Sequence, residues 1–154
     1  MQLTSCYLFR SLTASQLKSL TAISCEVMVQ NGQWLFQEGS VAERVYVLKS
    51  GAMELLTSVE GPVDLPITII RFPGGCFGSS ALIPPFQYSL SARGAENSVV
   101  ISMMRSDLQR LIQQDRELGY RIMSNLSTHL LERLKETRQE LKVHFKNLFR
   151  YAHA

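Results

Sequence analysis

The sequence predicts a mainly β fold of the α+β class, an antiparallel β-roll or jelly roll with a short helix before it and a long helix at its end. Between residues 26 and 104, short alternating polar and apolar segments recur at spacings of about 8–12 residues, separated by turn signals. Residues 7–25 and 105–154 instead show helical periodicity. We therefore expect one domain over residues 1–154, made of these three parts.

The first helix is predicted from its capping residues. Apolar side chains recur at Leu8, Leu12, Leu17 and Leu20. Thr13 can accept a hydrogen bond from the backbone N–H of Gln16, whose side chain can return the bond, as in a capping box. This pattern predicts a short helix from about Ala14 to Ala22.

The strands are predicted from alternation and from glycine-containing turns. Gly51 follows Ser50 and marks a hairpin, and Trp34 and Phe36 are expected in the core. Residues 59–66 are expected to form a hairpin loop. The strand segments are 26–30, 34–36, 43–50, 52–59, 67–72, 89–96 and 98–104.

Two helices are predicted after the roll. Ser106 is a candidate N-cap for the first, and the second runs from about Arg116 to beyond Phe145. Thr137 and His144 interrupt an apolar heptad stripe, whose members are Met123, Leu130, Leu134, Leu141 and Leu148. Such a stripe favours pairing with the same helix of a second copy, which predicts a homodimer. The alternatives are packing on its own domain and fraying.

Composition and charge exclude several classes of protein. No apolar run is long enough to span a membrane, no secretory signal precedes the domain, and three widely spaced cysteines fit a reduced, cytoplasmic protein. No nucleophile–base pair or metal-ligand spacing is present, so we expect no enzyme activity and no metal.

Residues 132–150 hold six basic and three acidic residues. This mixture is typical of a solvated helix face, and nucleic-acid or acidic-lipid contact is the alternative.

A glycine-rich segment, RFPGGCFGSSALI, is the main candidate for a binding site. Gly74, Gly75 and Gly78 let the backbone turn tightly and approach a ligand. A short helix starting near Ser79 would direct backbone N–H groups at an anion. The alternative is that these glycines only satisfy the geometry of the roll.

These segments together resemble the cyclic nucleotide-binding domain, the sensory module of catabolite activator/FNR-type regulators, kinase regulatory subunits and gated channels. The resemblance covers about residues 7–145 and depends on the combination WLFQEGS, YVLKSG and PGGCFG. It implies a phosphate-binding cassette, residues 69–83, and a small-molecule effector. The ligand-binding residues it implies are Phe77, Gly78, Ser79, Ser80, Ala81, Tyr88 and Ser89.

The cassette departs from the family pattern at two positions. The family has a glutamate that accepts a ribose hydroxyl where this chain has Ser79, and an arginine that pairs with the cyclic phosphate where it has Tyr88. Arg93 is offset by an odd number of residues, so it should face away from the site. Loss of both anchors should weaken cyclic nucleotide binding by about 3–5 kcal/mol.

The sequence therefore predicts a non-catalytic, ligand-sensing regulatory module that signals through its last helix, with weak or altered cyclic nucleotide binding. Three alternatives stay open: a scaffold with an inactive pocket, the sensory half of a transcription regulator, and a haem or redox sensor using His129 and Cys76. No cofactor is expected beyond a cyclic nucleotide or another small ligand. Because the chain stops at FRYAHA, no direct DNA binding and no membrane contact are expected of it.

Overall fold

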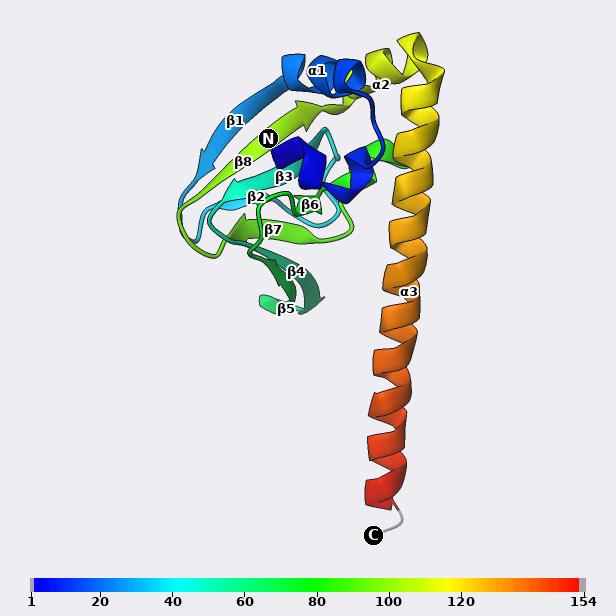
Figure 1. Ribbon diagram of the computed structural model, residues 1–154. Coiled ribbons are helices and arrows are strands. Elements are labelled where there is room, and N and C mark those ends of the chain that lie inside the picture. The colour runs from blue at the N-terminus through cyan, green and yellow to red at the C-terminus, as the bar shows by residue number, and fades with distance from the viewer. Residues whose placement is uncertain (1, 153–154) are drawn as a thin grey trace.

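Two four-stranded antiparallel sheets face each other, and one long helix runs beside them and extends well past them (Figure 1). The structure is a computed structural model that describes residues 2–152. The strands are β1 (Ser24–Val29), β2 (Trp34–Phe36), β3 (Arg44–Ser50), β4 (Met53–Glu60), β5 (Val63–Ile70), β6 (Cys76–Phe77), β7 (Ser91–Gly94) and β8 (Ser98–Met104).

The strand order confirms the predicted jelly roll. One sheet has the order β1-β8-β3-β6 and the other β2-β7-β4-β5, so each sheet combines strands from distant parts of the chain. All pairs are antiparallel. The apolar side chains between the sheets form the core, and β3 is buried on both faces because the N-terminal 3₁₀ turn covers its outer side.

The helix before the roll is confirmed in detail. Two 3₁₀ turns, η1 (Gln2–Ser5) and η2 (Tyr7–Phe9), lead into α1 (Ala14–Ala22). Thr13 Oγ1 accepts from the Gln16 backbone N–H at 3.2 Å, and Gln16 Oε1 accepts from the Thr13 N–H at 3.0 Å. Both bonds of the predicted capping box are therefore present.

Two helices follow the roll, α2 (Arg105–Gln114) and α3 (Arg116–Ala152). The prediction that Ser106 caps α2 is wrong: the helix already includes Arg105, Met104 is its N-cap, and no side chain caps it. Asp115 breaks the helical path between α2 and α3, and its Oδ1 accepts from the Leu118 backbone N–H at 3.0 Å. Gly119 lets the two helices cross closely, since a Cβ there would lie 2.6 Å from Ile112.

Two expectations about the strands are corrected. Trp34 is 38% exposed and not in the core; it lies at 5.2 Å from the Arg93 guanidinium, on the outer face of β2. The expected loop of residues 59–66 is mostly strand, because β4 continues to Glu60 and β5 begins at Val63. Pro66 fits inside β5 because the ladder shifts register between Leu55 and Leu56.

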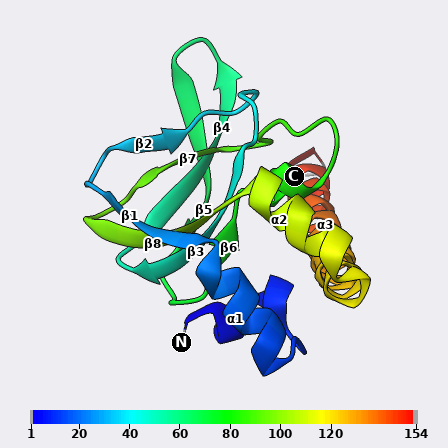
Figure 2. The same ribbon diagram turned by 90° about the horizontal axis from the view of Figure 1, so that it is seen from above.

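Seen from above, α1 and α2 lie at the same end of the roll, and α3 leads away from it (Figure 2). The first turns of α3 pack on the domain through Leu118, Ile122 and Leu126, each at most 1% exposed. No helix among residues 2–152 is long and apolar enough to cross a membrane.

The predicted hairpin at Gly51 is wrong, because β3 pairs with β6 and β8 in one sheet and β4 pairs with β5 and β7 in the other. Gly51 instead lies in the turn that connects the two sheets, and Gly39 offers a matched control for its backbone conformation. Both have positive φ, +89° and +81°, but only at Gly51 would a Cβ meet the backbone, 2.7 Å from Asn97 O. We expect Gly51→Ala to lower the free energy of unfolding by about 2–4 kcal/mol and Gly39→Ala by about 1 kcal/mol. Urea denaturation of both variants at equal protein concentration measures this, and equal losses would contradict it.

Candidate functional site

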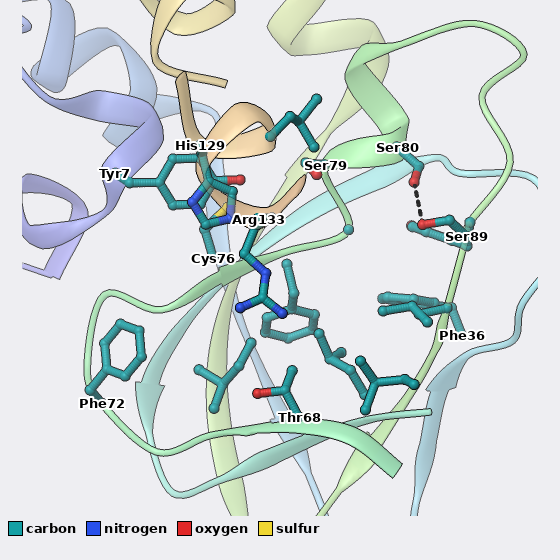
Figure 3. A pocket seen from close by; sticks show the side chains of 18 residues that line it. Tyr7, Phe36, Thr68, Phe72, Cys76, Ser79, Ser80, Ser89, His129 and Arg133 are labelled. Atoms are coloured by element: carbon teal, nitrogen blue, oxygen red, sulfur yellow. Dashed lines mark hydrogen bonds between the residues drawn. The ribbon is translucent and has the colours of Figure 1, made fainter. Parts of the chain in front are cut away.

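A cavity of about 280 Å³ lies between the roll and α3. Its walls come from several parts of the chain, and Tyr7, Phe36 and residues 88–90 also line it. The cassette contributes the segment from Cys76 to Ser80, the β4–β5 hairpin contributes apolar side chains and Thr68, and α3 contributes His129, Leu130 and Arg133. Figure 3 shows these side chains pointing into one space.

Six of the seven site residues expected from the resemblance line this cavity. They are Phe77, Gly78, Ser79, Ser80, Tyr88 and Ser89. Ala81 is fully buried in the core and is not among the lining residues. Four of the six lining side chains, those of Ser79, Ser80, Tyr88 and Ser89, carry only a hydroxyl group as their polar part.

The polar group of Tyr88 is hydrogen-bonded within the protein. Its hydroxyl donates to Arg44 O at 2.8 Å and accepts from the Arg44 backbone N–H at 3.2 Å. Its ring stacks on Phe36 with centroids 3.7 Å apart and planes 13° apart. Burial raises the pKa of Tyr88, so the phenol stays protonated. The side chain of Tyr88 therefore gives the cavity an aromatic surface, and its hydroxyl proton is already donated to Arg44 O.

The cassette glycines are required by contacts within the protein. Gly74 and Gly78 have φ of +94° and +75°. A Cβ on Gly74 would lie 2.2 Å from Ser5 Oγ, one on Gly75 2.2 Å from Ile70, and one on Gly78 3.0 Å from Arg44 O. After Gly78 the chain makes one 3₁₀ turn, η3 (Ser79–Leu82). The geometry of the roll thus explains all three glycines.

The polar groups left to the cavity from the cassette side are hydroxyls. Ser80 Oγ and Ser89 Oγ lie 3.5 Å apart at its edge (Figure 3). Arg93 does not line the cavity, as its odd offset predicts; its Nε instead donates to Glu54 Oε2 at 2.8 Å. The roll side of the cavity therefore carries no formal charge.

The sequence reasoning missed the α3 wall. His129 and Arg133 are four residues apart, so they lie on one face of the helix, and both line the cavity. The spacing of four residues predicts that the two side chains share a helix face. It does not predict which part of the domain that face contacts. Tyr7 was also missed; its ring stacks on His129 at 3.8 Å between centroids.

His129, on α3, and Cys76, on the cassette side, are the residues considered for a haem or redox role, and both line the cavity. Burial, and then the positive charge of Arg133, lowers the pKa of His129. The adjacent Cys6 thiol and burial raise the pKa of Cys76, which disfavours a reactive thiolate. Within residues 2–152, no three histidine, cysteine or acidic side chains group as metal ligands.

Residues 26–115 match the family described as the cyclic nucleotide-binding domain. The chain is 26% identical to the anaerobic regulatory protein of Bacillus subtilis over 127 residues, 82% of this chain. It spans 53% of that relative, or about half its length.

Solved structures agree with this match. A candidate cyclic nucleotide-binding protein from Geobacter metallireducens is 32% identical, with a TM-score of 0.71, and the alignment covers 82% of this chain and 91% of that one. The catabolite activator protein of Thermus thermophilus shares the fold, with 23% identity, a TM-score of 0.75, and coverage of 89% and 62%. The chain belongs to the cyclic nucleotide-binding domain family.

Proposed function

We propose that this chain is a ligand-sensing module in which an effector occupies the cavity and the response passes through α3. The observation that carries the proposal is the composition of the cavity wall, which includes both the cassette and His129, Leu130 and Arg133 of α3. A ligand touching both walls favours one position of the helix over others. That is a population shift, and its size is set by the difference in ligand affinity between the two helix positions.

The cassette supports an altered ligand preference. Ser79 offers a hydroxyl where a carboxylate would accept a ribose hydroxyl, and the Tyr88 hydroxyl is bound to Arg44. A cyclic phosphate would thus meet no cation from the roll, at a cost of about two to four decades in affinity relative to a domain with both anchors. We infer that the physiological effector is not a cyclic nucleotide bound in the ordinary way.

The route of the signal follows from how α3 is attached. Asn125 Nδ2 donates to Leu8 O and to Arg10 O, both at 3.0 Å, which ties the helix to the N-terminal segment. Asp115 breaks the path just before α3 and is the natural hinge. A movement of the cassette would therefore reach α3 through the cavity and be converted into rotation about this point.

The exposed stripe of α3 supports dimerisation through a second copy of the chain. Leu134, Leu141 and Leu148 are 46%, 54% and 51% exposed and fall seven residues apart. With Met123 they would form one seam of a left-handed coiled coil. Leu130, the remaining member of the stripe, is 45% exposed and also lines the cavity, so the seam would begin beside the cavity wall. The buried side chains of Leu118, Ile122 and Leu126 face the domain and are not members of the stripe. The names of the relatives, a regulatory protein and a catabolite activator, are consistent with a regulatory role.

Restoring the ionic anchors is expected to restore cyclic nucleotide binding. Ser79→Glu combined with Tyr88→Arg should tighten cyclic AMP binding by about 100-fold over the natural chain, measured by calorimetry. The control is Ser79→Gln with Tyr88→Gln, which changes the same sites without charge. Thermal melting checks that each variant folds. Equal affinity of the two double variants, or tight binding by the natural chain, would contradict the proposal.

A charge in the middle of the α3 seam is expected to separate the dimer. Leu141→Asp should give a monomer in sedimentation equilibrium, because the carboxylate would be desolvated between two helices. Gln139→Asp places the same charge on the outer face and should leave the dimer intact. A natural chain that sediments as a monomer at high concentration, or a Leu141→Asp variant that still dimerises, would refute the pairing.

A further inference from the structure

The cavity has a single formal charge, and it comes from α3. Among the 18 residues that line it, Arg133 is the one lysine or arginine, and none is aspartate or glutamate. The other arginines near the roll are not lining residues; Arg44 donates to Ser102 Oγ at 3.0 Å and Arg93 to Glu54. Any anion that enters the cavity therefore meets its countercharge on the helix wall.

Arg133 is placed to meet such an anion. Its side chain reaches from α3 into the middle of the cavity, with the guanidinium directed toward Thr68 (Figure 3). Its Nη1 also donates to Glu136 Oε2 at 2.7 Å, one turn along the helix. Both side chains of that pair are about half exposed, 49% and 56%, so the pair is weak. The guanidinium has five N–H donors, and the pair with Glu136 leaves others to bind a ligand.

The rest of the lining is suited to an apolar body. The rings of Phe36 and Tyr88 are stacked, and the β4–β5 side contributes Leu55, Ile67 and Ile70. Hydroxyl groups lie at the edge, on Ser80 and Ser89. A ligand that fills the cavity would bury an aromatic or aliphatic part against these walls and place its anionic group at the helix.

We propose that Arg133 is the anion-binding residue of this cavity, and that its effector is a compact molecule with an apolar or aromatic body and one anionic group. The proposal rests on the proposed function, since it presumes that an effector occupies the cavity. It also extends the proposed function, because the charged contact lies on α3. The bound anion would then contact the helix through which the response passes. Recognition and signalling then depend on the same side chain.

Two dyes of one skeleton test the charge requirement in the full chain. Anilinonaphthalene sulfonate has an aromatic body and one anionic group, and phenylnaphthylamine is its neutral counterpart. We expect a saturable site that prefers the sulfonate by about tenfold, measured by fluorescence titration. Arg133→Gln should remove this preference without weakening the neutral dye. Lys135→Gln, which removes a positive charge from the same helix outside the cavity, should leave the preference unchanged.

A third variant tests the competition with Glu136. Glu136→Gln should tighten sulfonate binding by about threefold, because the guanidinium is released from its pair. Perturbation of the His129 ring resonances on sulfonate addition should locate the site, since that ring lies in the same wall.

Several results would overturn the proposal: equal binding of the two dyes, equal loss in Arg133→Gln and Lys135→Gln, or binding of neither dye. The proposed function is tested separately by whether α3 changes its pairing or position when the cavity is filled. A sulfonate that binds through Arg133 without any change in α3 would refute the signalling role and leave the anion site standing. A neutral dye that shifts α3 as much as the sulfonate does would refute the anion site and support the signalling role.

Discussion

The character of the cavity depends on the hydrogen bonds of the Tyr88 hydroxyl. This hydroxyl is held by both backbone groups of Arg44, and the Tyr88 ring lies flat on Phe36. These contacts tie the loop after the cassette to β3, so they stabilise the roll. They also place a neutral aromatic ring in the wall of the cavity. The hydroxyl of this side chain is thus used within the domain.

With no charge on the roll side, the electrostatics of the cavity are set by α3. Arg133 carries the formal charge among the residues that line the cavity. Burial is the largest cause of the lowered pKa of His129, and the positive charge of Arg133 is the second. The helix that extends away from the roll is therefore also the helix that supplies the charged side chain of the cavity wall.

The two halves of α3 have different surroundings. Its first turns are anchored by Leu118, Ile122 and Leu126 and by the bonds of Asn125 to the N-terminal segment. Beyond the cavity the helix projects into solvent with an apolar stripe along one side (Figure 1). The anchored half thus contributes to the cavity wall, and the projecting half carries the exposed apolar stripe.

The sequence by itself determined the features that depend on neighbouring residues: the capping box of Thr13 and Gln16, the turn at Gly51, and the heptad stripe of α3. These follow from hydrogen bonds and periodicities within a few residues, and the structure has all three. The resemblance placed the cassette along one wall of the cavity. Only the tertiary structure decided that Trp34 faces outward and that Arg133 enters the cavity. The spacing of residues fixes which of them share a helix face, whereas the packing of distant segments decides what that face meets.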